Sequence, residues 1–179
     1  MFPNAAHRHS WETFEAIFCI PFLVAIALEF LHGLSFPERV RQVAVPVGAA
    51  LIVAGLAVGV LARRELARRG QPTNPGLPTT GLVTTGVFRI SRNPLYLGGA
   101  GIIGGIGLAF NLPWVLILLG PSIIAGHYVL IAPEERYLAG KFGEPYLRYA
   151  ASVRRWIGRG RTSTPTDRDQ QSPHSSIQG

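Results

Sequence analysis

The sequence contains one cysteine, Cys19, which lies inside an apolar run. A single cysteine excludes an internal disulfide bond and a metal site built from several thiolates. We therefore predict no metal centre. We expect Cys19 itself to be a small buried apolar side chain.

Charged residues are also scarce, at 15% of 179 residues, whereas hydrophobic residues make up 47%. The mean hydropathy is +0.25, and long blocks without charge alternate with short basic segments. This is the pattern of a polytopic membrane protein rather than of a soluble one. We predict an all-α helical bundle that is integral to a membrane, with the lipid bilayer as a partner.

Lysine is nearly absent, because Lys141 is the only one and the other basic residues are arginines. The net charge of +7 is compatible with nucleic-acid binding in general, but here the arginines sit in short segments beside apolar spans. Such segments keep loops on the cytoplasmic side of a membrane. We predict no nucleic-acid partner, and the oligomeric state stays open.

Four apolar stretches are long enough, or nearly so, to cross about 30 Å of hydrocarbon. They comprise residues 13–34, 43–62, 95–110 and 113–132. Most arginines lie on one side of these spans, and only Arg39 and Arg41 lie on the other. By the positive-inside rule both termini are cytoplasmic. Glycines recur in the second and third spans, which predicts close approach of a helix or a ligand.

The segment from Glu134 to Arg159 is predicted to be a cytoplasmic appendix in two helical pieces. Gly143 ends the first piece and Pro145 opens the second. Apolar residues recur at steps of three and four, as expected for an amphipathic helix on the inner leaflet or over the bundle. They are Leu138, Phe142, Tyr146, Tyr149, Val153 and Trp156. The tail after Gly160 is expected to be disordered.

A polar constellation surrounds the third and fourth spans. Residues 81–96 lead into the third span and contain two arginines and two aromatic residues, while Glu134 and Glu135 follow the fourth span. A tight hairpin would bring these groups to one cytoplasmic hollow. Cations, carboxylates and aromatic faces suit a zwitterionic nucleotide-like cofactor such as S-adenosylmethionine. The residues alone leave open a plain turn before a helix and a solvated acidic first turn.

Two sequence motifs in this part of the chain resemble those of a known family. Residues 81–98 read Gly-Leu-Val-Thr-Thr-Gly-Val-Phe-Arg-Ile-Ser-Arg-Asn-Pro-Leu-Tyr-Leu-Gly, and residues 133–149 read Pro-Glu-Glu-Arg-Tyr-Leu-Ala-Gly-Lys-Phe-Gly-Glu-Pro-Tyr-Leu-Arg-Tyr. Together they resemble the isoprenylcysteine carboxyl methyltransferase and phospholipid methyltransferase superfamily, over about residues 80–157. The sequence departs from the prenylcysteine branch at Asn93, where that branch has histidine.

The resemblance implies an S-adenosylmethionine-dependent methyltransferase that acts on a lipophilic acceptor. Its implied cofactor-binding residues are Leu82, Val83, Phe88, Arg92, Asn93, Pro94, Leu95, Tyr96, Glu134 and Glu135. The candidate catalytic residues are Glu134, Arg89 and His127. His127 is either an acceptor-site base or a buried, hydrogen-bonded histidine, and the second interpretation is favoured. The chain would then divide into a tail (residues 1–11), two spans (12–62), a cofactor-binding half (63–157) and a second tail (158–179).

Two other functions remain open at this point. Sterol-type reductases are similar in this half and bind NADPH, although the 2′-phosphate of NADPH favours more cations and fewer carboxylates than the pair Glu134 and Glu135 allows. A non-enzymatic membrane scaffold would bind no cofactor. The identity of the methyl acceptor is not encoded in any motif.

Overall fold

The computed structural model describes residues 15–72 and 79–160, and these residues form helices without a strand. The elements are η2 (Glu15–Cys19), α2 (Ile20–His32), α3 (Glu38–Arg68), η3 (Gly86–Arg89), α4 (Pro94–Ala109), α5 (Pro113–Gly126), η4 (His127–Ile131), α6 (Ala132–Phe142) and α7 (Glu144–Ser152). The predicted all-α class is confirmed. Both predicted tails lie wholly or largely outside the described residues.

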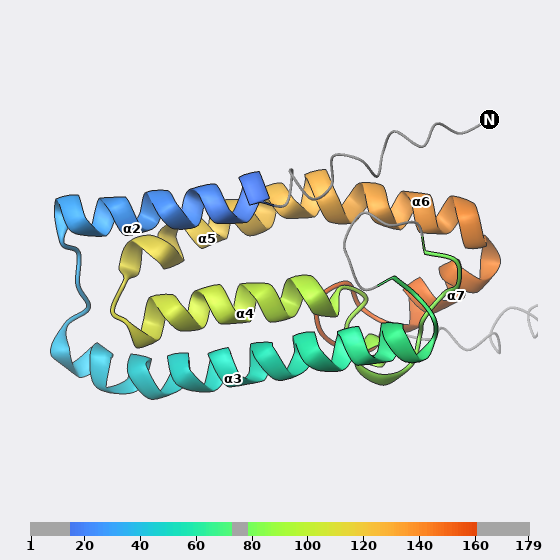
Figure 1. Cartoon of the computed structure of the whole chain (residues 1–179), viewed down its shortest axis with the longest axis horizontal. Coiled ribbons are helices and arrows are strands. Elements are labelled where there is room, and N and C mark those ends of the chain that lie inside the picture. The colour runs from blue at the N-terminus through green and yellow to red at the C-terminus, as the bar shows by residue number, and fades with distance from the viewer. Residues whose placement is uncertain (1–14, 73–78, 161–179) are drawn as a thin grey trace, which may run out of the picture.

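The helices form an elongated bundle (Figure 1). Helix α2 packs against α5, and α4 packs against both α3 and α5. The α2–α3 connection and the α4–α5 turn lie at one end of the bundle, while the start of α4, α6 and α7 lie at the other. Residues from both predicted motifs are therefore gathered at a single end.

Glycines bring α3 and α4 into backbone contact. A Cβ on Gly55 would lie 2.6 Å from the carbonyl oxygen of Gly98, and a Cβ on Gly48 would lie 2.6 Å from that of Gly105. The relation is reciprocal, because a Cβ on Gly98 or Gly105 would strike the carbonyl oxygen of Gly55 or Gly48. Residues without a side chain allow this approach. The predicted close helix contact is confirmed at these four positions.

Much of the apolar surface of the bundle faces outward. Two continuous helical runs, Glu38–Arg68 and Pro113–Phe142, are long and apolar enough to cross a membrane, and Ala16–His32 and Pro94–Ala109 are shorter apolar helices. Phe30 is 88% exposed and Leu31 is 75% exposed. A soluble protein would bury such side chains, whereas hydrocarbon solvates them. The count of four spans stays a prediction.

Two helix boundaries differ from the predicted ones. Helix α3 begins at Glu38, immediately after Pro37, so the predicted connection over residues 35–42 is shorter than expected. The fourth apolar helix does not end at Ala132, because a π-helical turn, His127–Ile131, joins α5 to α6, which begins at Ala132. Pro133 does not break it, because it lies in the first turn of α6, where a missing N–H is tolerated.

Two further expectations were wrong. Cys19 is exposed, because η2 and α2 pack through Phe18 and Ala25, which are buried. The amphipathic helix ends at Ser152, not beyond Trp156, since Val153 has extended backbone angles and pairs in an isolated antiparallel bridge with Arg159. We call residues 153–160 the C-terminal strap.

Candidate functional site

The site is built on the corner between η3 and α4. Asn93 precedes a proline and has φ −127° and ψ 57°, outside the helical region that a following proline disfavours. Pro94 then opens α4, where its missing N–H costs nothing. Ser91 is buried, and its Oγ accepts the backbone N–H of Asn93 at 3.1 Å and donates to the carbonyl oxygen of Arg155 at 3.2 Å. The corner is thereby held in one conformation.

The C-terminal strap is docked on this corner by backbone hydrogen bonds. The N–H of Arg92 donates to the carbonyl oxygen of Arg154 at 3.2 Å, and the N–H of Gly158 donates to that of Ile90 at 2.9 Å. Each of these bonds pairs a backbone donor with a backbone acceptor from the other segment. The strap therefore has a defined position beside the start of α4.

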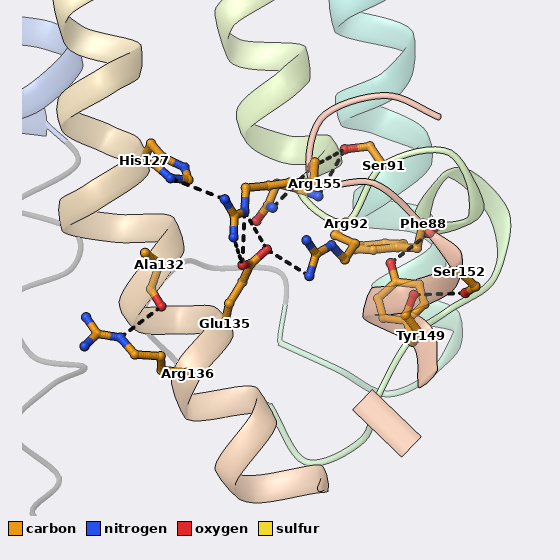
Figure 2. A network of polar contacts seen from close by, with 11 residues as sticks. Phe88, Ser91, Arg92, His127, Ala132, Glu135, Arg136, Tyr149, Ser152 and Arg155 are labelled. Carbon is orange, nitrogen blue, oxygen red and sulfur yellow. Dashed lines mark hydrogen bonds and ion pairs between the residues drawn. The ribbon is translucent and has the colours of Figure 1, made fainter. Parts of the chain in front are cut away.

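Docking of the strap completes a cluster of four side chains, His127, Arg155, Glu135 and Arg92, which we call the polar cluster (Figure 2). Arg155 contacts both oxygens of Glu135, with Nη2 2.6 Å from Oε2 and Nε 3.1 Å from Oε1. Arg92 Nη1 lies 3.3 Å from Oε1 of the same carboxylate. The Nε2 atom of His127 lies 3.3 Å from Nη1 of Arg155.

The polar cluster has two cations for one carboxylate. The side chains of Arg92 and Glu135 are 14% and 13% exposed, so solvent screens their ion pair weakly. The hydrogen bond from Arg155 to Glu135 raises the pKa of the Arg155 guanidinium above its ordinary value. Two further nitrogens, Nε of Arg92 and Nδ1 of His127, are buried and have no hydrogen-bond partner among the described residues. The cluster thus has a spare donor, Nε of Arg92, for an anionic ligand.

Glu134 lies beside the cluster without joining it. The residue as a whole is exposed, but neighbouring atoms surround its carboxyl group, and this burial raises the pKa of the group. The carboxylate interacts electrostatically with Tyr96 and with Glu135. The acidic first turn of α6 and the first turn of α4 are therefore neighbours in space. Glu134 is accessible to a ligand, whereas Glu135 is already engaged by two arginines.

Helix α7 provides an aromatic platform under the corner. Tyr146, Tyr149 and Val153 form a buried cluster, and Leu82 and Phe88 pack against it. The hydroxyl of Tyr149 donates to the carbonyl oxygen of Phe88 at 2.7 Å. Burial raises the pKa of the Tyr149 phenol above its ordinary value, so this donor stays protonated. The segment before the corner is thus fastened to α7.

Most of the predicted site residues meet at this end of the bundle. Arg92, Glu135 and His127 belong to the polar cluster, and Asn93 donates through Nδ2 to the carbonyl oxygen of Arg155 at 3.4 Å. The other predicted positions at the corner are buried or half-buried, namely Leu82, Val83, Phe88, Pro94, Leu95 and Tyr96. Arg89 is exposed and lies outside the polar cluster.

Sequence reasoning missed Arg155 and Ser91. The predicted helix placed Arg155 on a solvated face, whereas the strap turns it toward Glu135, twenty residues earlier in the chain. No local sequence pattern identifies an ion pair between two residues that lie twenty positions apart. The backbone N–H of Gly81, next to the predicted cofactor-binding residues Leu82 and Val83, donates to Oε1 of Gln71 at 2.9 Å. The two tyrosines of α7 belong to the apolar repeat and to the second quoted motif, but neither was predicted as a site residue.

Comparison with known proteins matches this sequence to a family. The phospholipid methyltransferase family matches residues 43–145, which include the corner, His127 and both glutamates. An uncharacterized protein of Haemophilus influenzae is 40% identical over 50 residues, which are 28% of this chain and 76% of that protein. No solved structure matches the chain significantly. The chain belongs to the phospholipid methyltransferase family, which is a family of membrane methyltransferases.

Proposed function

We propose that the chain is a membrane-embedded, S-adenosylmethionine-dependent methyltransferase that acts on a lipophilic acceptor. The observation that carries this proposal is the meeting of the Arg92–Tyr96 corner with Glu134 and the polar cluster at one end of an apolar bundle. All of these groups except Arg155 lie within the residues that match the family.

The donors and acceptors at the corner fit this cofactor. The buried Nε of Arg92 has no partner among the described residues, and a guanidinium is a strong donor to a carboxylate such as that of the methionyl group. The accessible carboxylate of Glu134 suits the ammonium group or the ribose hydroxyls. The rings of Phe88 and Tyr96 suit adenine or the sulfonium cation. Glu135 positions Arg92 and Arg155 instead of binding the cofactor.

S-adenosylmethionine supplies an electrophilic methyl group when it is bound. Transfer of a methyl group depends mainly on proximity, alignment and exclusion of water. In this chain the corner and Glu134 would hold the cofactor, and the apolar helices would admit the lipophilic acceptor from the bilayer. The C-terminal strap, docked across the corner, would limit the access of water from the cytoplasm.

Neither alternative function is favoured by the family match. A 2′-phosphate of NADPH beside Glu134 would lie next to a like charge, which is unfavourable. The polar cluster compensates little for this repulsion, because Glu135 already balances one of the two positive charges of Arg92 and Arg155. A scaffold gives no reason for buried donors without partners at the corner.

Calorimetry on protein in detergent micelles tests the proposal. S-adenosylhomocysteine should bind, and NADPH should not. Glu134→Gln should weaken S-adenosylhomocysteine binding at least about tenfold, the effect of losing one hydrogen bond to a charged group. Glu144→Gln is the matched control, because Glu144 is an exposed carboxylate in the first turn of the next helix. Its substitution should leave affinity unchanged.

Each other outcome has a clear meaning. Heat with NADPH alone would replace the methyltransferase proposal by the reductase, and heat with neither ligand would favour a scaffold. Equal losses of affinity in Glu134→Gln and Glu144→Gln would show that Glu134 does not bind the cofactor and only stabilises its helix through the helix dipole. Arg159→Ala, at an exposed position of the strap, should also bind normally.

A further inference from the structure

A groove lies between the last turns of α3 and η3, at the end of the bundle that carries α7 (Figure 1). Its volume is about 310 Å³. It is lined by Leu61, Arg64, Glu65 and Arg68 of α3 and by Gly86 and Val87 of η3. None of these residues belongs to the polar cluster or to the predicted cofactor-binding set. The groove is therefore built from residues other than those of the candidate site.

Hydrogen bonds between α3 and Thr85, the residue before η3, fix one wall of the groove. Oγ1 of Thr85 donates to Oε1 of Glu65, and Nη2 of Arg69 donates to Oγ1 of Thr85 at 3.1 Å. Gly86 has a φ of +60°, and a Cβ at this position would lie 3.2 Å from Oε2 of Glu65. A residue without a side chain lets η3 approach α3 this closely. The groove thus has a defined shape.

The groove carries a net positive charge. Arg64 and Arg68 are four residues apart, on one face of α3, and both are exposed. Neither forms a salt bridge or a side-chain hydrogen bond within the part of the chain that the structure describes. Among the described residues that line the groove, Glu65 alone is acidic. Its carboxylate is already engaged by Thr85 and by Arg69, whose Nε lies 3.6 Å from Oε1.

An apolar strip of α3 continues from the groove along the helix. Leu61, Ala57 and Val53 lie on the same face as Arg64 and Arg68, because they precede these arginines at steps of three and four residues. All three are exposed, and Val53 is 67% exposed. Helix α4 contacts another face of α3. A polar groove that opens onto an exposed apolar strip matches the layout of a phospholipid, in which a charged head group is followed by hydrocarbon chains.

The volume and the charges of the groove select one kind of lipid. Ligand pockets typically measure about 300 to 1,000 Å³, so a groove of about 310 Å³ holds a head group but not the hydrocarbon chains. Guanidinium groups bind phosphate strongly and often at two points. The ammonium group of a zwitterionic lipid would need a free carboxylate, whereas Glu65 is engaged and the arginines would repel the ammonium. A lipid with a net negative charge is therefore favoured.

We propose that the groove between α3 and η3 binds the phosphodiester head group of an anionic phospholipid from the cytoplasmic leaflet. Arg64 and Arg68 hold the phosphate, and the apolar strip contacts an acyl chain. The cytoplasmic leaflet is the one that is rich in anionic lipids. This lipid is a bound partner and not the methyl acceptor, because the groove shares no residue with the candidate site. The inference goes beyond the proposed function and does not depend on it.

Native mass spectrometry of the protein in detergent micelles tests the site. With equal amounts of dioleoyl phosphatidylglycerol and dioleoyl phosphatidylcholine, the wild type should retain the phosphatidylglycerol at least about tenfold better. Arg64→Gln and Arg68→Gln should each reduce this preference about tenfold, the effect of losing a hydrogen bond between charged groups. Arg63→Gln is the matched control, because Arg63 is an exposed neighbour on the same helix that does not line the groove.

Two results of this comparison would overturn the proposal. One is equal retention of the two lipids by the wild type. The other is an equal loss in Arg63→Gln and Arg64→Gln, which would indicate general attraction to a basic helix end. Arg64→Lys keeps the positive charge and should retain the preference within about threefold. A fall in Arg64→Lys as large as that in Arg64→Gln would contradict recognition of the phosphate by charge.

A soluble head group identifies the source of the phosphate. Glycerophosphoglycerol, which lacks acyl chains, should not displace phosphatidylglycerol at equal concentration, because it has no contact with the apolar strip. Displacement would make the groove a site for a soluble phosphate ester and would overturn the assignment to a lipid. The affinity for S-adenosylhomocysteine should be the same in Arg64→Gln and in the wild type. A tenfold loss would place Arg64 in the cofactor site and contradict a separate lipid site.

Discussion

Glu135 is the residue on which the geometry of the site depends. Its carboxylate receives Arg155 in a two-point contact and Arg92 from the other side. Planar, two-point pairing fixes the orientation of a guanidinium as well as its distance. Through Arg155 this orientation extends to His127, so one carboxylate from α6 sets the direction of donors from the corner and the strap.

Tyr149 is a second single residue with a large expected effect, in this case on the stability of the fold. Its hydroxyl donates to the carbonyl oxygen of Phe88 from a buried position. Tyr149→Phe should destabilise the protein by about 1 to 2 kcal/mol, because the carbonyl oxygen loses its partner in an apolar surrounding. The measurement is thermal unfolding in detergent, and Tyr128→Phe, at a ring that is 68% exposed, is the control. Equal melting temperatures for the two variants would contradict this role.

At the scale of elements, the contact between α3 and α4 determines where the corner is placed. The glycine pairs at Gly55 with Gly98 and at Gly48 with Gly105 let the two backbones meet. Because Pro94 opens α4 and Gly98 lies one turn later, any separation of these helices would move the start of α4 and its neighbouring site.

Two adjacent glycines in α4 provide a matched test. A Cβ on Gly98 would lie 2.8 Å from the carbonyl oxygen of Gly55, whereas a Cβ on Gly99 would meet nothing within 4 Å. Gly98→Ala should destabilise the protein by about 1 to 3 kcal/mol through overpacking. Gly99→Ala should be neutral or stabilising by up to about 1 kcal/mol, from helix propensity. Thermal unfolding in one detergent compares them, and the reverse order would exclude close helix contact at Gly98.

For the whole molecule, the exposed apolar surface and the distribution of charge point to one orientation in a membrane. The α2–α3 connection and the strap lie at opposite ends of the bundle (Figure 1). Arginines are concentrated at the end that carries the strap. By the positive-inside rule this end should face the cytoplasm.

Cysteine labelling in intact cells checks that orientation. In a Cys19→Ala background, Ser35→Cys should react with a membrane-impermeant maleimide added outside, and Arg159→Cys should react only after the membrane is permeabilised. The reason is that the two positions flank an odd number of predicted spans. Labelling of both from outside, or of Arg159→Cys alone, would refute the predicted topology.

The sequence by itself determined the helical class, the apolar helices and the composition of the corner, because these depend on local hydropathy and on the backbone restrictions of glycine and proline. Even the acidic pair and Asn93 were identified as site candidates from their motifs. The tertiary structure alone decided that Glu135 pairs with two arginines while Glu134 stays accessible, and that the strap supplies Arg155 to His127. Such contacts join residues far apart in the chain, and only packing of the helices brings them together.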